Sequence, residues 1–260
     1  MDQVCGAETH RFDDMLQFVF SPALGELPWL RHGSTTRDFS HPQANRLEEL
    51  IQFRRTLGLS DDVSIVRGDQ RHTDNVEIAT DTVVSLARET GQHVFAATDA
   101  VVTAEPNVMI AILTADCAPL LLVDPKKKII GVTHAGWRGS FDRIAEKTVS
   151  RMRELGAVPD DIVAWVGPMI GGCCYEVSEE LAGQFQDEFG SLAEPGKPFA
   201  NGRLLDLPEL NAAQLMKMGL RRDHVHRSGL CTMHLRDQFY SYRGDQGTTG
   251  RIISAMAITG

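Results

Sequence analysis

The stretch Thr114–Ser140, TADCAPLLLVDPKKKIIGVTHAGWRGS, contains two short apolar runs separated by a polar, proline-containing turn. The runs Pro119–Val123 and Ile129–Val132 are rich in Leu, Ile and Val, a pattern that predicts two paired β-strands. Cys117 lies just before the first run, and His134 lies just after the second. Because the outer ends of an antiparallel hairpin lie side by side, the sequence predicts that this thiol and this imidazole meet in space.

The overall composition is that of an ordinary globular protein. The chain has 260 residues, of which 42% are hydrophobic and 23% charged, enough for one large domain or two small ones. Its net charge of −9 argues against sequence-independent binding of nucleic acids, which requires a positive face. The acidic N-terminus lacks the apolar segment of a signal peptide, and no apolar run has the roughly 18 residues of a membrane span. We therefore expect neither a nucleic-acid nor a membrane partner.

The five cysteines do not form the pattern of a disulfide framework, because their number is odd and most lie far apart. This usage indicates a reducing compartment, and we expect a cytoplasmic location. Cys173 and Cys174 are adjacent, in the glycine-rich segment GPMIGGCCYEV. Adjacent cysteines rarely bridge without strain and small thiols fill tight loops well, so we expect them to pack or to line a pocket. The same interpretation applies to Cys231.

Apolar periodicity predicts an α+β fold with a mixed sheet, because the strands are too numerous for a regular alternation of strands and helices. Residues 1–15 are expected to form a poorly ordered tail, residues 16–260 a single domain, and residues 190–203 a loop. The predicted helices cover residues 45–57, 82–89, 139–155, 178–189 and 207–218. The predicted strands cover residues 63–66, 76–78, 99–103, 108–113, 162–166, 225–226, 239–242 and 252–258.

His72, Cys117 and His134 each lie at the polar end of an apolar strand. Two imidazoles and one thiolate form a donor set for zinc, and three protein ligands leave a fourth position for water or substrate. Each residue alone is equally compatible with a hydrogen-bonded histidine or an inert cysteine. The same residues also suggest a metal-free site, in which Cys117 is a nucleophile and His134 its base. Asp116 would then orient the pair, or would be a turn residue.

Arginines beside glycines mark two candidate anion contacts. Arg138 lies between the two glycines of GWRG at a predicted strand-to-helix junction, where backbone N–H groups favour an anion. Near the C-terminus, Tyr242, Arg243 and Arg251 lie among glycines in a segment that has the features of a ligand-facing loop. The alternative in both places is an exposed arginine in a turn.

Five motifs together resemble the YfiH-like, or laccase-domain, family. They occur in the order GDQRHTDNV, LTADCAPLLLVD, GVTHAGWRGS, VGPMIGGCCYEV and LCTMHLRDQFYSYRGDQGTTGR. The resemblance extends from about residue 32 to the C-terminus. It implies a single α/β/α-type sandwich related to the catalytic domain of cytotoxic necrotizing factor.

The resemblance also implies an activity and a metal. Family members bind one zinc through the residues that match His72, Cys117 and His134. They were long regarded as multicopper polyphenol oxidases, and they are now regarded as purine nucleoside phosphorylases acting on adenosine, inosine and methylthioadenosine, with adenosine deaminase activity. The implied partners are therefore purine nucleosides and phosphate. On this basis we expect Arg138, with Arg243 or Arg251, to contact phosphate, and Asp116 to act as general acid–base.

The chain departs from the family pattern in two places. TTRDFSHPQANR lacks the two glycines that usually follow the family's Thr-Arg pair, which affects the rim of the pocket and the substrate range. The usual double arginine is Arg243-Gly244 here, so one candidate anion contact is missing.

Three alternative functions fit the same residues. A copper polyphenol oxidase is one, because a site with two nitrogens and one sulfur also binds Cu²⁺. The nine histidines are nevertheless scattered, and we expect no role for His234 and the others outside the candidate site. A metal-free Cys–His hydrolase is the second alternative, and a non-enzymatic module that binds a metal or a nucleoside is the third.

Overall fold

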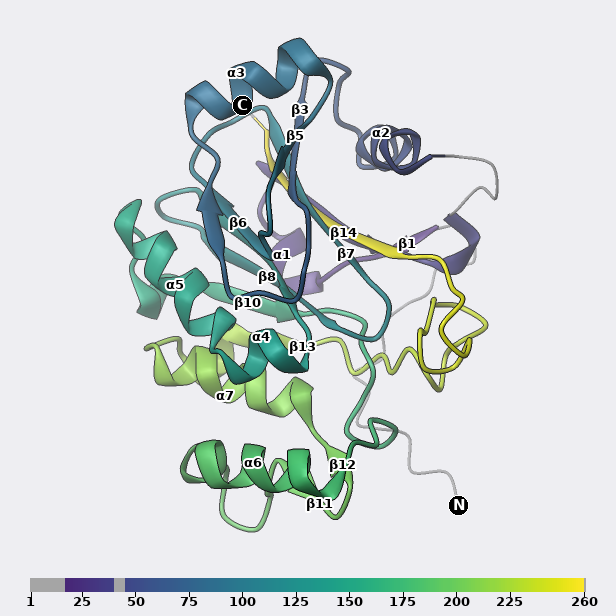
Figure 1. Cartoon of the computed structure of the whole chain (residues 1–260). Helices are drawn as coiled ribbons and strands as arrows, with labels where there is room; N and C mark the ends of the chain where they lie inside the picture. The colour runs from purple at the N-terminus through teal and green to yellow at the C-terminus, as the bar shows by residue number, and fades with distance from the viewer. Residues whose placement is uncertain (1–16, 40–44, 260) are drawn as a thin grey trace.

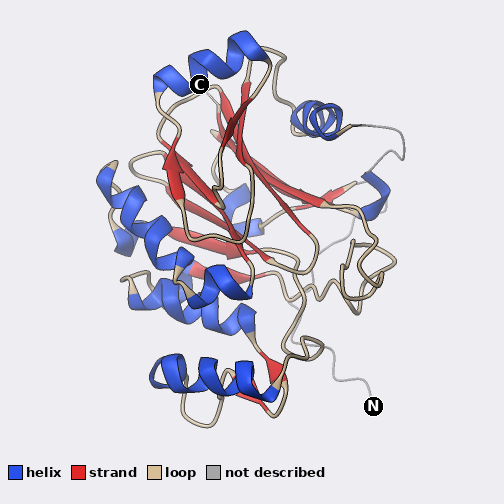
Figure 2. Ribbon diagram, in the orientation of Figure 1, coloured by secondary structure: helices blue, strands red, loops and turns tan. Residues whose placement is uncertain are grey.

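Two mixed β-sheets form the centre of the molecule, and helices cover their outer faces (Figures 1 and 2). The computed structural model describes residues 17–39 and 45–259. The tail expected at residues 1–15 lies outside the described residues. The predicted α+β class is confirmed, and the β layer of the expected sandwich consists of two packed sheets.

The first sheet is antiparallel on one side and parallel on the other. Its long central strands are those that the apolar runs predict. In spatial order its six strands are β1 (Phe18–Val19), β2 (Leu30–Thr35), β14 (Ile252–Ile258), β7 (Val108–Thr114), β3 (Ser64–Gly68) and β5 (His93–Phe95).

The second sheet contains the hairpin of the opening stretch at its centre. Every residue of β8 (Ala118–Asp124) and β9 (Ile129–Ala135) is buried, and the pair is antiparallel with Ala118 opposite Ala135. The prediction of a hairpin is therefore confirmed. In spatial order the six strands are β13 (Val225–Arg227), β10 (Val163–Val166), β8 (Ala118–Asp124), β9 (Ile129–Ala135), β6 (Ala100–Thr103) and β4 (Val76–Ile78).

Each sheet has its own helical cover, and the inner faces of the sheets pack on each other. Side chains such as Ile110 of β7 and Leu121 of β8 belong to the core between the sheets. Helix α2 (Arg46–Thr56) covers the outer face of the first sheet through Leu50 and Phe53. The second sheet is covered by α5 (Ile144–Glu154) and α7 (Leu207–Lys217), and α6 (Glu179–Phe189) lies beyond α7, with Phe185 packed on Phe141 (Figure 1). The remaining elements are α1 (Pro22–Gly25), α3 (Asp81–Thr90), α4 (Trp137–Phe141), the strands β11 (Ala200–Asn201) and β12 (Leu204–Leu205), and four 3₁₀ turns at Arg37–Phe39, Pro159–Asp161, Gly190–Leu192 and Arg222–His224.

The single helix predicted over residues 139–155 is wrong, because the chain forms α4 and α5 there. Arg143 lies between them with a φ of 61°, in the left-handed region that ends a helix. Its guanidinium forms an ion pair with Glu188 and lies 5.0 Å from the ring centre of Phe189. These contacts offset part of the conformational cost of a positive φ at a non-glycine residue. The break is invisible in the sequence because Phe141 and Ile144 keep helical spacing across it.

The strand predicted over residues 239–242 is also wrong, because this segment belongs to a long irregular loop. Phe239 and Ser241 are buried while Tyr242 is exposed, which is the alternation of a strand. The backbone groups of this segment, however, bond within turns of the loop and not to a second strand, since Phe239 N–H donates to the Leu235 carbonyl. The two N–H groups that follow the segment bond to side chains. Gly244 N–H donates to Ser241 Oγ at 2.9 Å, and Arg243 N–H donates to Asp116 Oδ2 at 2.7 Å. The loop expected at residues 190–203 contains a 3₁₀ turn and the short strand β11.

Within residues 17–39 and 45–259, no helix combines the length and the apolar character needed to cross a bilayer.

The turn of the central hairpin depends on one buried carboxylate. Asp124 Oδ1 accepts N–H bonds from Lys126 and Lys127, both at 2.9 Å, and Oδ2 accepts the N–H of Val158 at 2.9 Å.

We predict that Asp124→Ala lowers the free energy of unfolding by about 2–3 kcal/mol, because hydrogen bonds to a charged acceptor are lost. Urea unfolding measures the change. The exposed Asp160→Ala is the control, with an expected change below about 0.5 kcal/mol, and equal losses in both variants would contradict the prediction.

Candidate functional site

The central hairpin places Cys117 and His134 at the same end of the second sheet. His134 lies in β9 opposite Pro119, and Cys117 directly precedes β8. His72, from the loop after β3, completes a cluster with them: its Nε2 lies 3.9 Å from Cys117 Sγ. The His72 and His134 ring centres are 4.9 Å apart. One ligand atom from each of the three residues lies within 4.8 Å of the others, so the structure brings the predicted set together.

A buried carboxylate, Asp99, holds both histidines, and the sequence did not reveal it as a site residue. Asp99 Oδ1 is 2.7 Å from Nδ1 of His134 and accepts the backbone N–H of His72 at 3.1 Å. Its Oδ2 accepts the backbone N–H groups of Arg71 and Thr73 at 3.1 and 2.8 Å. The only sequence feature that could have indicated Asp99 is its position as an acidic residue directly before the apolar residues that begin β6.

Cys117 and His134 favour opposite charges on each other, and Asp99 supports the protonated His134 ring. Burial disfavours the Asp99 carboxylate, but hydrogen bonds from His134 and Thr73 outweigh burial and lower its pKa to about 2. Burial likewise disfavours charge on Cys117 and on His134. The negative thiolate and the positive imidazolium nevertheless stabilise each other. The pKa of the Cys117 thiol is lowered by the His134 and His72 rings, and the pKa of His134 is raised by Cys117 and Asp99. The geometry therefore favours a thiolate, which is the form that binds a metal or attacks an electrophile.

The close approach of the three side chains requires glycine at position 136. A Cβ atom on Gly136 would lie 2.9 Å from Cδ2 of His72 and 3.0 Å from Sγ of Cys117. Gly136 directly precedes α4, so the predicted strand-to-helix junction is present. Any larger residue at this position would push His72 and Cys117 apart.

Asp116 is buried and both of its oxygens have partners. Oδ1 accepts the hydroxyl of Thr232 at 2.6 Å, and Oδ2 accepts the N–H of Arg243 at 2.7 Å. Its φ of 83° places it in the left-handed region, where a non-glycine residue is strained. Asp116 therefore joins the segment before Cys117 to the C-terminal loop.

A pocket of about 510 Å³ opens beside the three-residue cluster. Its size is in the range of small-molecule sites. Three arginines and one aspartate are among its lining residues, so the pocket favours an anionic ligand. The lining residues are Arg46, Arg67, Gly68, Asp69, Gln70, His72, Leu113, Ala115, Cys117, His134, Tyr242 and Arg251.

The predicted anion contacts separate into two groups. Arg251 and Tyr242 line the pocket, whereas Arg138 and Arg243 do not. The Arg138 guanidinium lies 4.3 Å from the ring centre of Trp137, and the Arg243 guanidinium donates to the carbonyl oxygen of Glu176 at 2.8 Å. Arg46 and Arg67 also line the pocket, although the sequence did not predict them as site residues. Both lie beside quoted segments, at the end of TTRDFSHPQANR and directly before GDQRHTDNV, but nothing in those segments marks an anion contact.

Tyr175 lies on the side of the cluster where Arg138 and Arg243 are found. Burial and then the negative charge of Cys117 raise the pKa of its hydroxyl to about 12, while Arg243 and Arg138 oppose that shift. The Arg243 guanidinium lies 5.4 Å from the centre of the Tyr175 ring. The glycine-rich segment thus reaches the candidate site through Tyr175.

Proteins of known sequence and structure resemble most of this chain. Purine nucleoside phosphorylase YlmD of Bacillus subtilis is 38% identical over 201 residues, covering 75% of this chain and 71% of the relative. A purine nucleoside phosphorylase of Corynebacterium glutamicum is 36% identical over 208 residues, covering 80% of this chain and 76% of the relative. The crystal structure of YlmD from Geobacillus stearothermophilus superposes with a TM-score of 0.78 at 25% identity, covering 95% of this chain and 97% of that one.

A second solved structure and a family model agree with these relatives. The Bacillus licheniformis protein YfiH superposes with a TM-score of 0.77 at 27% identity, covering 94% of this chain and 97% of that one. The model of the family described as multi-copper polyphenol oxidoreductase laccase matches residues 35–259. This family and the His–Cys cluster both point to a bound metal ion. The chain therefore belongs to this laccase-like family, the YfiH-like family that its motifs resemble.

Proposed function

We propose that this protein is a zinc-dependent purine nucleoside phosphorylase that also deaminates adenosine. The observation that carries the proposal is the convergence of His72, Cys117 and His134 on the wall of a cationic pocket. Relatives named purine nucleoside phosphorylase support the substrate class. Adenosine, inosine and methylthioadenosine are the proposed substrates.

The three residues fit a zinc ion because Asp99 fixes the orientation of His134. With Nδ1 of His134 facing Asp99, the proton is held on that nitrogen and Nε2 is left as the ligand atom. The lowered pKa of Cys117 supplies a thiolate. When bound, zinc would act as a Lewis acid toward the substrate and, for deamination, toward water.

Phosphorolysis requires the chain to hold an anion beside the nucleoside. A phosphate oxygen forms a bond to C1′ of the ribose, and the bond from C1′ to the purine nitrogen breaks with its electron pair on the purine, which takes up a proton. We assign the phosphate to Arg251 with Arg46 and Arg67, because these guanidinium groups share the pocket with Cys117. Tyr242 would pack on the base. Arg138 and Arg243 are the alternative phosphate contacts, on the Tyr175 side.

The general acid–base is the remaining assignment. Asp116 is the general acid–base expected from the sequence. The hydrogen bonds of its carboxylate to Thr232 and Arg243 favour a positioning role instead. Asp116 would then act through the loop that carries Tyr242 and Arg243, and would reach the substrate only if that loop shifts.

A metal-free Cys–His hydrolase is a second candidate, favoured by one specific contact. The 2.7 Å approach of Asp99 Oδ1 to His134 Nδ1 is the arrangement of a base held by a carboxylate beside a nucleophile. A copper polyphenol oxidase remains the alternative that the family description suggests. Removal of metal with a strong chelator separates the hydrolase from the two metal-dependent candidates, because only the metal-free hydrolase keeps its activity.

The function is tested by incubating the purified protein with adenosine, with and without phosphate. We predict adenine and ribose-1-phosphate when phosphate is present, and inosine with ammonia when it is absent. Product analysis by chromatography distinguishes the two reactions. Failure to convert adenosine, inosine or methylthioadenosine under either condition would refute the proposed function.

Asp99→Asn should weaken metal binding at the three-residue cluster. An asparagine amide can donate to Nδ1 of His134, which would move the ring proton to Nε2 and block that ligand atom. We predict a zinc affinity roughly 10–100-fold lower, as for other partners of metal-bound histidines. Competition with a chromogenic chelator measures it. Asp81→Asn, an exposed acid of α3, is the control, and equal affinities in the two variants would exclude this role for Asp99.

Arg251→Ala tests the assignment of the phosphate contact. Losing a charge-assisted hydrogen bond of about 1.5–3 kcal/mol should raise the KM for phosphate roughly 10–100-fold. Deamination, which uses no phosphate, should change far less. The exposed Arg153→Ala is the control for loss of a cation. If Arg138→Ala or Arg243→Ala raises the KM for phosphate while Arg251→Ala does not, the phosphate lies on the Tyr175 side.

A further inference from the structure

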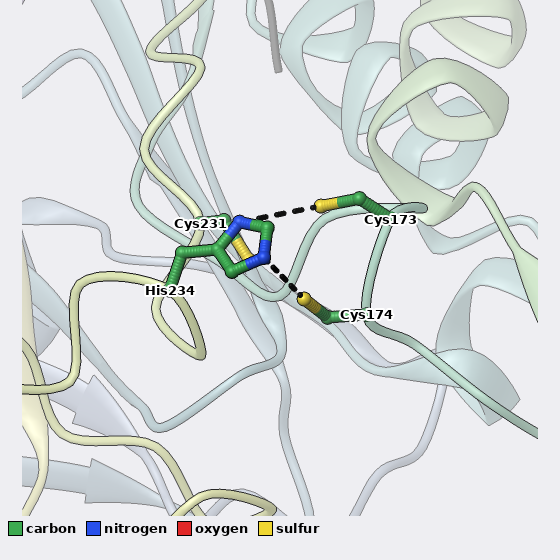
Figure 3. A group of neighbouring side chains, drawn as sticks. All are labelled: Cys173, Cys174, Cys231 and His234. Carbon is green, nitrogen blue, oxygen red and sulfur yellow. Dashed lines mark hydrogen bonds between the residues drawn. The ribbon is translucent and has the colours of Figure 1, made fainter. Parts of the chain in front are cut away.

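A second cluster of metal-binding side chains lies outside the proposed active site. Cys173 and Cys174 come from the turn that follows β10, and Cys231 and His234 come from the turn that follows β13 (Figure 3). One ligand atom from each of the four residues lies within 4.8 Å of the others. Cys231 is buried while His234 is exposed, so the cluster lies where the core meets the surface.

One nitrogen of His234 and the three sulfurs would form a tetrahedral site after the ring turns. Sγ of Cys174 lies 3.3 Å from Nε2 of His234, and Sγ of Cys173 lies 3.7 Å from Nδ1, the other nitrogen of the same ring. An imidazole offers only one of its two nitrogens to a given ion. With metal bonds of about 2.3 Å to sulfur and about 2.0 Å to nitrogen, the donors of a tetrahedral zinc lie roughly 3.5–3.8 Å apart. Because one donor atom of each residue already lies within 4.8 Å of the others, a rotation of His234 that turns one nitrogen toward the three sulfurs would be enough to enclose an ion.

The backbone around the cluster holds its sulfurs in place. Gly171 N–H donates to Sγ of Cys231 at 3.3 Å. Both pairs of donors lie in tight turns, since Tyr175 N–H donates to the Gly171 carbonyl and Leu235 N–H donates to the Cys231 carbonyl. A Cβ on Gly171 would lie 3.0 Å from Sγ of Cys173, so glycine gives the sulfur its room.

We propose that Cys173, Cys174, Cys231 and His234 form a second zinc site with a structural role. Three sulfurs and one imidazole select zinc among the common divalent ions, and four protein ligands leave no position for substrate. The site shares no residue with the His72, Cys117 and His134 cluster. It therefore differs from the proposed catalytic centre in both donors and function.

The second site would hold the wall of the active site on its Tyr175 side. Tyr175 directly follows Cys174, and its ring lies 5.4 Å from the guanidinium of Arg243. Thr232 directly follows Cys231, and its hydroxyl donates to Asp116, which also accepts the N–H of Arg243. A bound ion would thus fix the two turns that lead into Tyr175 and Thr232. Tyr175 packs near Arg243, and Thr232 holds Asp116, which directly precedes Cys117.

The test is a count of bound zinc in purified full-length protein and its variants, by elemental analysis. His234→Ala should lose about one zinc per chain relative to the unchanged protein. His72→Ala, which alters the other cluster, should keep the zinc of the second site, so the result does not depend on the proposed activity. His234→Cys, which offers four sulfurs, should retain the ion.

Cobalt identifies the donors independently of the count. When Co²⁺ replaces zinc, the charge-transfer absorption of bound thiolates should fall sharply in Cys174→Ser and should be retained in His234→Cys. A zinc content unchanged by His234→Ala and Cys174→Ser would overturn the proposal. So would copper in place of zinc at this cluster, loss of the ion in His234→Cys, or a disulfide among the three cysteines in freshly purified protein.

Discussion

The buried carboxylate of Asp99 joins the loop that carries His72 to the strand that carries His134. It fixes the backbone of the loop and the orientation of the His134 ring. It accepts the backbone N–H groups of residues 71–73 and contacts the ring of His134. The loop is thereby held in a shape in which His72 has a positive φ of 61°. A buried charge without such partners would be costly, so the loop and the ring must be in place for Asp99 to remain ionised. Fold and site are therefore coupled through one side chain.

The central hairpin and Gly136 position the other residues of the site. The hairpin is buried along its whole length, so the register that opposes Pro119 and His134 is fixed by the core. Gly136 leaves the space that His72 and Cys117 occupy. Around this centre, arginines reach the pocket from α2, β3 and the C-terminal segment. An anion is the ligand that such a wall favours.

Local patterns predicted the hairpin and the donor set, because burial on both faces gives continuous apolar runs with reactive residues at their ends. Long-range contacts were beyond the sequence. Asp99, the pocket arginines, and the meeting of Cys174 with His234 all depend on how separate segments pack. The predicted strand at residues 239–242 failed because alternating burial also occurs in a loop whose backbone groups bond within its own turns. The helix predicted across Arg143 failed because apolar spacing does not report a positive φ.

The central claim is that His72, Cys117 and His134 hold one metal ion, with Asp99 orienting His134. Diffraction from crystals of the purified protein at the zinc absorption edge tests it most directly. The account predicts an anomalous peak about 2.0–2.3 Å from Sγ of Cys117 and from Nε2 of both His72 and His134. A zinc-containing crystal with no peak among these three atoms would contradict it, as would Nε2 of His134 facing Asp99.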